Sequence, residues 1–445
     1  MQRPVSRRRA LAKLSVLGAC TAGASRTFAD EPRSAAAAVD QAYDELGRRF
    51  LDRHGVMIDF ADLDGRVDLP TPDECRSGKP NALGWFQPIE NGAMFNGMYL
   101  DGVVARWEAT RDARDAARAR RLMEGLLFLN SISPVKGFVA RGVSTDGRAH
   151  YPMGSNDQTL PWFYGLRRYR ESALATEEER VRIARHLAET AEAIVGLGWR
   201  MPAEEPFRTR GSFAGRAFSG VARRAFVAKY LHVVTGDAAW ERRYRRILEE
   251  PDDAAGSTLD TLRRGMRFEY ARTHNWTSCC EVAALRALWE LEPDAALKRA
   301  YATGLAASAT LAAESLPLYA RFDVRSPTTF SLDWRRAMMP LWQPQSTEHE
   351  AQQLAERQLR EFLKHSPRRA DETAFVREPT SAAWIVSLCP DAAVVGRHAA
   401  EIERLVRHYD YAKLYYSTFF WVEAAWRRMR EAAGRPGINR PSRTS

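Results

Sequence analysis

The chain has 445 residues, of which 45% are hydrophobic, 27% charged and 10% aromatic. Its 12 Trp and 19 Phe can bury a large core, which excludes a disordered chain, and no apolar run approaches the roughly 20 residues that a membrane span requires. The formal net charge of +10 suggests a polyanionic partner such as nucleic acid, so the positions of the charges decide how that number is interpreted.

The first 29 residues predict an export signal. The run from Ser6 to Lys13 is basic and resembles the twin-arginine pattern, and a short, weakly apolar run from Leu14 to Ala24 follows it. Cleavage is expected after Ala29, and a competing lipobox-like site would leave a lipidated Cys20 as a lipid anchor. We therefore expect a periplasmic or extracellular protein.

This assignment changes the meaning of the charge. Residues 1–29 hold six basic groups and no acid, so removing them takes the formal net charge from +10 to +4. Residues 434–445 form a basic tail with three further arginines, which leaves the body, residues 30–433, near +1. The charge thus gives no reason to expect a nucleic-acid partner.

Helical periodicity dominates the body. The predicted helices are Ala35–His54, Gly92–Thr110, Asp112–Asn130, Thr159–Ala173, Glu177–Leu197, Ala214–Val234, Ala238–Glu250, Leu259–Phe268, Cys279–Leu291, Asp294–Glu314, Gln345–Lys364, Ser381–Leu388, Ala392–Tyr409 and Lys413–Glu431. Short turns separate many consecutive helices, which predicts antiparallel pairs.

Longer connections alternate with these tight turns, at 131–158, 198–213, 268–278, 316–345 and 365–380. A short strand is expected at Val135–Val143, and no linker interrupts 34–431. The alternation predicts an all-α fold with a single domain at 30–433: an (α/α) toroid of antiparallel helical hairpins, with the long loops on one face.

The first group of candidate residues surrounds the start of the predicted helix at Gly92. Glu90 and Asn91 precede it and are candidates for substrate binding. Asp101 shares a helical face with Asn91 in an otherwise apolar stripe, where a carboxylate is costly unless it is paired or functional. Asp101 is therefore either a catalytic carboxylate in a central cavity or a buried group satisfied by an arginine or a backbone N–H.

The second group opens the next predicted inner helix, in the segment from His150 to Trp162. Asp157 is the candidate general acid/base, with His150, Gln158 and Trp162 around a substrate. The alternative is that Asp157 or Thr159 only caps the helix, but capping accounts for one polar residue and not for the whole cluster.

A third group comprises His274, Asn275 and Trp276, which could contact and stack on a sugar ring just before a helix. Ser278 and Glu281 have the spacing of a capping box, which predicts that this helix begins at Cys279. A structural histidine and a core tryptophan are the alternative.

Two arginines, Arg141 and Arg210, are candidates for binding a carboxylate by their forked geometry, with solvated loops as the alternative. Neither cysteines nor histidines show metal-ligand spacing, so no metal is predicted, and no motif indicates a cofactor. The absence of nucleotide-binding, serine-hydrolase and zinc-protease motifs removes support from those classes.

The chain of helix pairs with polar loops resembles the six-hairpin glycosidases and the related (α/α)6 lyases. The local similarity is to the unsaturated glucuronyl and rhamnogalacturonyl hydrolases. It rests on Gly97–Asp112, on the turn Thr235-Gly236-Asp237, and on Asn156-Asp157-Gln158 at the start of a helix. The resemblance implies that Asp157 acts first as acid and then as base, with Asp101 as its electrostatic partner.

Three functions follow as expectations. The first is an exported glycoside hydrolase that acts on an oligosaccharide or polysaccharide, with or without uronates. The second is a uronate lyase, in which His274 or Tyr151 removes a proton while Asn275 or Arg141 neutralises the carboxylate. The third is a non-catalytic glycan-binding toroid, which predicts no close pair of carboxylates.

Overall fold

The computed structural model describes residues 33–253, 256–268, 271–432 and 434. It is mostly helical, with 63% helix and 4% strand, which confirms the expected all-α class. The predicted export signal and almost all of the predicted basic tail lie outside the described residues.

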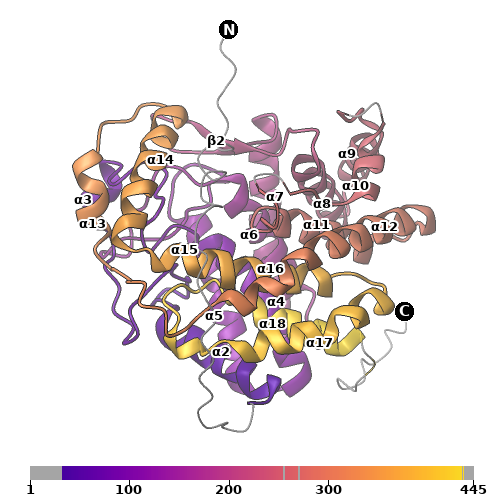
Figure 1. Ribbon diagram of the computed structural model, residues 1–445. Helices are drawn as coiled ribbons and strands as arrows, with labels where there is room; N and C mark the ends of the chain where they lie inside the picture. The colour runs from indigo at the N-terminus through magenta and orange to yellow at the C-terminus, as the bar shows by residue number, and fades with distance from the viewer. Residues whose placement is uncertain (1–32, 254–255, 269–270, 433, 435–445) are drawn as a thin grey trace.

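Helices account for most of the described chain (Figure 1). The longer helices are α2 (Ala35–Arg49), α4 (Gly92–Thr110), α5 (Ala113–Ser131), α6 (Asn156–Arg170), α7 (Glu177–Gly196), α8 (Phe218–Thr235), α9 (Ala238–Glu249), α11 (Ser278–Leu291), α12 (Ala295–Ala312), α14 (Glu348–His365), α16 (Glu378–Ser387), α17 (Ala392–His408) and α18 (Trp421–Ala432). Shorter helices are α3 (Pro72–Arg76), α10 (Thr258–Arg264), α13 (Trp334–Met338) and α15 (Arg368–Glu372).

Two kinds of helix can be distinguished by burial. Helices α4, α8, α11 and α16 are buried on nearly every side, whereas α9, α14 and α17 bury one stripe and expose the other. In Figure 1, α4, α6, α16 and α18 lie near the middle of the view, and α9, α12, α14 and α17 lie toward its edge.

The buried helices pack on one another across long stretches of sequence. Helix α4 packs against both α6 and α18, α18 packs against α16, and α11 packs against α6, α8 and α16. Each also packs on its neighbour in the chain, as α4 does with α5, α8 with α9 and α11 with α12. The expected antiparallel pairing by short turns is therefore reflected in the contacts.

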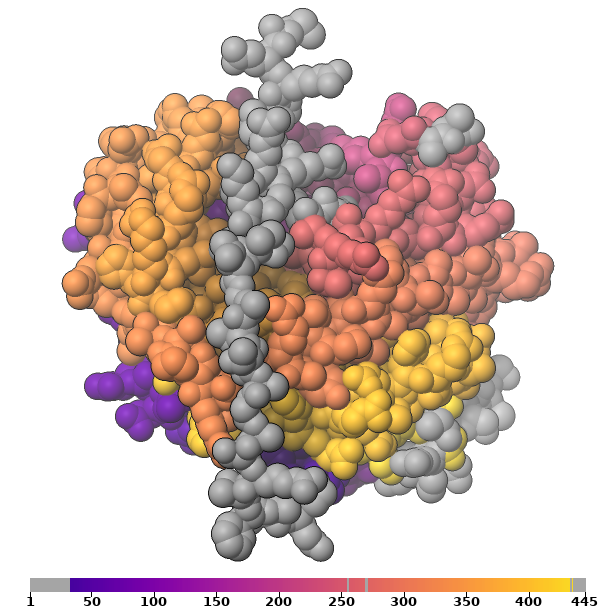
Figure 2. Space-filling model, in the orientation of Figure 1, coloured from indigo at the N-terminus to yellow at the C-terminus, as the bar shows by residue number. Residues whose placement is uncertain are grey.

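The tight turns between paired helices contain the left-handed residues and capping side chains that such turns require. After α8, Gly236 adopts a left-handed conformation with φ 71°, and the Asp237 side chain caps α9. After α4, Arg111 takes the same conformation with φ 58°, and Asp112 caps α5. The long connections lie between these pairs, and α13 and α14 occupy the left part of the face drawn in Figure 2.

Several local predictions were wrong. Residues 135–143 form no strand; the strands are β1 (Arg200–Pro202) and β2 (Thr209–Ser212), an antiparallel pair in the 198–213 connection. Helix α11 begins at Ser278 without a capping box, because the Ser278 hydroxyl donates to the carbonyl of Arg267 instead.

Candidate functional site

The candidate site lies where the N-terminal ends of α4 and α6 meet. These helices run side by side in the same direction, because Asn91 bonds Gln158 at their starts and Asp101 bonds Arg168 further along both. The Gln158 amide donates to Asn91 Oδ1 at 3.2 Å, and its oxygen accepts the backbone N–H of Met94 at 3.1 Å. Two residues predicted from separate motifs are thus in contact.

Asp157 lies in the first turn of α6, beside Gln158. The Ser155 side chain caps this helix, so Asp157 is not needed as the cap. Its carboxylate keeps 21% of its side-chain area exposed and accepts a hydrogen bond from Arg223 Nη2 at 2.9 Å. A partly exposed carboxylate at a helix N-terminus is stabilised by the helix dipole and can still reach a ligand.

Arg223 connects Asp157 to a second carboxylate. It comes from α8, and the same Nη2 atom also donates to Glu281 of α11. Arg223 and Glu281 are both buried, at 2% and 1% side-chain exposure. Burial alone would lower the pKa of Arg223, but Glu281 and Asp157 raise it above its ordinary value, so the guanidinium stays charged.

A second pair of carboxylates lies on the other side of Asn91. The Asp59 carboxylate accepts the Asn91 backbone N–H at 2.8 Å and its side-chain amide at 2.6 Å. Burial and the neighbouring Glu90 carboxylate raise the pKa of Asp59 well above its usual range, although the Asn91 bonds and Arg369 oppose the shift. Glu90 is slightly exposed and pairs with Arg369 at 3.3 Å.

The segment before α11 contributes aromatic and amide groups. Trp276 is partly buried and lies edge-on to Phe95 of α4, with ring centroids 5.6 Å apart, and the Arg377 guanidinium lies 4.5 Å from its ring centroid. Asn275 is fully buried and bonds both Glu378 of α16 and Ser315. His274 is partly buried beside them.

Buried polar atoms without a hydrogen-bond partner among the described residues occur in the segments that form this end of the helices. They are Nε and Nη1 of Arg223, Oδ1 of Asn275, and the hydroxyls of Thr277 and Thr418. Each such group costs about 1–3 kcal/mol when it is left unsatisfied in a protein interior. Their occurrence here is what a site that binds polar ligands or ordered water requires.

The backbone is also strained in the loops that lead into the N-terminal ends of α4 and α11. Phe86 has φ 67°, and its N–H donates to Glu90 at 2.8 Å. Thr273, just before His274, has φ 68°. Non-glycine residues in the left-handed region cost of order 1–3 kcal/mol and are concentrated at functional sites.

The structure does not bring Asp101 to this site. Asp101 is fully buried, and its oxygens accept from Arg168 at 2.7 Å and from Arg428 at 2.7 and 2.9 Å, with the Trp384 indole at 3.2 Å. Arg168 lies eleven residues beyond Asp157 on α6, which is about 16 Å along the helix at 1.5 Å per residue. The arrangement is the arginine-satisfied alternative, and Asp101 is not the neighbour of Asp157.

The remaining predicted residues serve the surrounding structure. Trp162 is fully buried and donates to the carbonyl of Leu126 at 2.9 Å. His150 pairs with Glu204 at 3.0 Å. Arg141 holds the loop before α4 through the carbonyl of Glu90 at 2.8 Å, so it borders the site as a scaffold.

Arg210 is likewise engaged within the chain. It is largely buried in β2, and its guanidinium pairs with Glu348 of α14 at 3.1 Å.

Several residues of the site were missed by the sequence analysis: Asp59, Arg223, Glu281, Arg369, Arg377 and Glu378. A signal was available for two of them, because Arg223 and Glu281 are charged residues inside apolar helices, the same signal that singled out Asp101. The others lie in loops or at the boundaries of short helices, where no periodicity marks them.

Comparison with protein-family models, with curated proteins and with solved structures finds no match for this chain. Within the described residues, no group of three or more His, Cys, Asp or Glu side chains is arranged to hold a metal ion. Among these same residues, no helix is both long enough and apolar enough to cross a bilayer.

Proposed function

We propose that this chain is an exported carbohydrate-active enzyme, a glycoside hydrolase that acts on an oligosaccharide or polysaccharide at the N-terminal ends of α4, α6, α8 and α11. The observation that carries the proposal is the partly exposed Asp157 carboxylate, oriented by the buried Arg223–Glu281 pair. A positioned carboxylate of this kind is what general acid–base catalysis requires.

The proposal includes a toroidal fold. The packing of α4 on α6 and α18, of α18 on α16, and of α11 on α16 and α6 closes a ring, and α8 joins it by packing on α11 and by the Arg223–Asp157 bond to α6. These contacts support a toroid in which the six buried helices are surrounded by α2, α5, α7, α9, α12 and α17. In such a ring the inner helices begin at one end, which would gather the long connections around the proposed site.

The second carboxylate of the mechanism is proposed to be the Asp59–Glu90 pair, in place of Asp101. Asp59 keeps its proton to a higher pH than an ordinary aspartate, and Glu90, the less buried of the two, pairs with Arg369 at 3.3 Å. The Asn91–Gln158 hydrogen bond links this pair to Asp157. Two carboxyl sites in different surroundings suit an acid and a base that act on one glycosidic bond.

The residues also suit sugar recognition. Trp276 offers an aromatic surface for stacking, while Arg223, Asn275, Thr277 and Thr418 hold donors and acceptors that the protein does not satisfy within its described residues. The hydroxyls of a sugar can form hydrogen bonds with such groups without bringing a charge into the site.

A uronate lyase is the second candidate. It is favoured by Arg377, which stacks on Trp276 near Asn275 and His274 and could neutralise a sugar carboxylate while a base removes the neighbouring proton. Its products would contain a new C=C bond and absorb ultraviolet light.

The test is a screen of the protein from Asp30 onward against neutral and acidic oligosaccharides, read by reducing ends and by ultraviolet absorbance. Asp157→Asn should lower kcat by about 10²–10⁴-fold, the usual contribution of a general acid or base. Asp73→Asn, an exposed aspartate in the first turn of α3, is the control and should leave kcat unchanged. Ultraviolet-absorbing products, or full activity of Asp157→Asn, would refute the hydrolase.

A further inference from the structure

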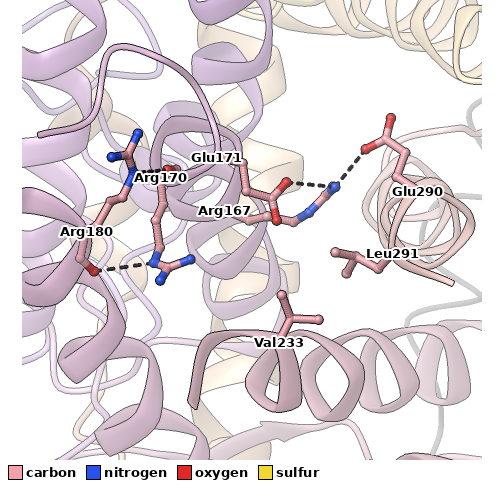
Figure 3. Close-up of a pocket in the computed structure, with 7 residues that line it drawn as sticks. All are labelled: Arg167, Arg170, Glu171, Arg180, Val233, Glu290 and Leu291. Carbon is pink, nitrogen blue, oxygen red and sulfur yellow. Dashed lines mark hydrogen bonds and ion pairs between the residues drawn. The ribbon is translucent and has the colours of Figure 1, made fainter. Parts of the chain in front are cut away.

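A cavity lies at the end of the central helices opposite to the site proposed above. It has a volume of about 460 Å³ and is lined by Arg167, Arg170, Glu171, Arg180, Val233, Glu290 and Leu291 (Figure 3). These residues come from the last turns of α6, α8 and α11 and from the first turns of α7. The site proposed above lies at the first turns of α6, α8 and α11, so the two are separate.

The cavity contains a buried guanidinium that is only partly used. Arg167 is 3% exposed, and its Nη2 faces Glu171 at 3.0 Å and Glu290 at 2.9 Å. Its Nε and Nη1 have no hydrogen-bond partner among the described residues. These N–H groups are donors without acceptors on two different edges of the guanidinium plane, and each can donate one hydrogen bond to an oxygen of a carboxylate or phosphate.

The rest of the lining is held in place and adds positive charge. The Nε of Arg170 donates to the carbonyl of Arg180 at 3.3 Å, and the Nε of Arg180 donates to the carbonyl of Arg170 at 3.2 Å, which fixes both side chains (Figure 3). With three arginines against two glutamates, the lining keeps a net positive charge.

One wall of the cavity is apolar. Val233 is 48% exposed, and Leu291 lies across from it. A volume in the range of about 300–1,000 Å³, with apolar walls and a few convergent polar groups, is typical of small-molecule sites.

We propose that this cavity is a binding site for a small organic anion, whose carboxylate or phosphate oxygens accept from Arg167 and whose carbon skeleton lies against Val233 and Leu291. The inference does not depend on the proposed hydrolase activity, because none of its residues belongs to that site. Free phosphate, a sugar phosphate and a uronic acid share the recognised chemistry.

The test measures binding directly. Isothermal titration calorimetry of the protein from Asp30 onward, at constant ionic strength, is carried out with sodium phosphate, glucose 6-phosphate and sodium glucuronate, with sodium chloride as the reference. Saturable binding of at least one anion is expected. Binding of glucose 6-phosphate alone or of glucuronate alone would identify the class of ligand. No saturable binding of any of the three anions would overturn the proposal.

Two variants locate the site. Val233→Trp should fill the cavity and raise Kd at least tenfold without removing a charge. Arg167→Lys should do the same by removing the unpartnered Nε–H and Nη1–H donors while leaving a cation between the glutamates. The matched control is Val181→Trp. Val181 is an exposed valine on α7 that does not line the cavity, so this variant should keep the wild-type Kd. Unchanged binding by a folded Val233→Trp variant would overturn the assignment.

Discussion

Asp101 and Asp157 both face arginines, yet their surroundings give them different roles. Asp101 is fully buried and, despite the opposing effect of burial, the guanidiniums of Arg428 and Arg168 hold its pKa well below the usual range. Asp157 is partly exposed at a helix start. The first environment stabilises the fold, and the second can take part in chemistry.

A substitution at each position should separate these roles. Asp101→Asn leaves Arg168 and Arg428 buried without their carboxylate, so we expect a loss of about 3–5 kcal/mol in the free energy of unfolding. Asp157→Asn should cost no more than about 1 kcal/mol, because Arg223 keeps Glu281 and the site is open to water. Urea denaturation measures both, and equal losses would contradict the assignment of Asp101 as structural.

Glu372 gives the stability of the protein a dependence on pH. It is fully buried, it accepts the backbone N–H groups of Tyr415 and Tyr416 at 2.9–3.2 Å, and it pairs with Arg368 at 3.1 Å. Burial raises its pKa to about 7 from an ordinary 4.5, although these bonds oppose the shift.

The sign of the effect follows from proton binding. Between pH 4.5 and 7 the folded protein binds more protons at Glu372 than the unfolded chain does. The stabilising contribution of Glu372 to the free energy of unfolding is therefore fully present below pH 4.5 and is lost as the pH rises through 7. Glu372→Gln should remove this slope, so the difference in unfolding free energy between variant and wild type should change by up to about 3 kcal/mol between pH 5 and 8. Urea titrations at both pH values check this, and an unchanged difference would show that Glu372 is ionised throughout.

Individual site residues could be predicted only where one segment holds the signal. Asp157, Gln158 and Asn91 stand out as polar residues at helix starts, and the structure brings them together. Asp59 could not be found in this way, because its environment is created by Glu90 and Asn91, which lie about 30 positions further along the chain. Burial of a carboxylate by distant segments leaves no local pattern.

At the scale of helices, α4 and α6 approach each other closely because glycines face the contact. A Cβ atom on Gly97 would lie 2.0 Å from the carbonyl oxygen of Pro161, and one on Gly165 would lie 2.6 Å from Gly97 itself. Small residues at this crossing let the two backbones come close, and this approach sets the distance between Asn91 and Gln158.

Gly97→Ala should therefore push α4 away from α6. We expect a loss of about 1–3 kcal/mol in stability from overpacking, together with reduced activity, because the Asn91–Gln158 contact would lengthen. Gly196→Ala at the end of α7 is the control: nothing lies within 4 Å of its added Cβ, so stability should be unchanged or rise by up to about 1 kcal/mol. Thermal unfolding of both variants measures the difference. An equally stable Gly97→Ala variant would show that the helix contact can relax.

Most helices were predictable because their signals are local. Glu177–Gly196 begins with a capping box at Thr176 and Glu179, and Gly92–Thr110 has the predicted bounds. One short strand was expected at 135–143, whereas the pair β1–β2 at 200–212 was not predicted, because strands of three or four residues are specified by pairing and not by alternation. The start of α18 was predicted eight residues early, because Tyr411–Lys413 form a separate 3₁₀ turn.

At the scale of the whole molecule, the fold depends on contacts that no local pattern contains. Helix α18, near the end of the chain, packs between α4 and α16. Hydrophobic periodicity predicts that α18 buries a face, but it does not say against which helix, so the proposed ring rests on analogy at the level of the sequence. The basic charge likewise belongs to the ends of the chain and not to the folded body.

The position of α18 leads to a test of the proposed ring. A chain that ends at Phe420 loses the buried Trp421, Val422 and Trp426 and exposes the apolar faces of α4 and α16. Because deletion of even one large buried side chain costs about 3–5 kcal/mol, loss of the whole helix should exceed the stability of a typical domain. Circular dichroism and size exclusion should show a chain without cooperative unfolding.

The control is a chain of similar length that begins at Asp30, which lacks only the predicted export signal and should unfold cooperatively. A peptide spanning 417–432, added in excess to the shortened chain, should restore a cooperative transition if α18 closes the gap between α4 and α16. If the chain that ends at Phe420 unfolds with the same midpoint as the control, α18 contributes little to the fold and the closed ring is refuted.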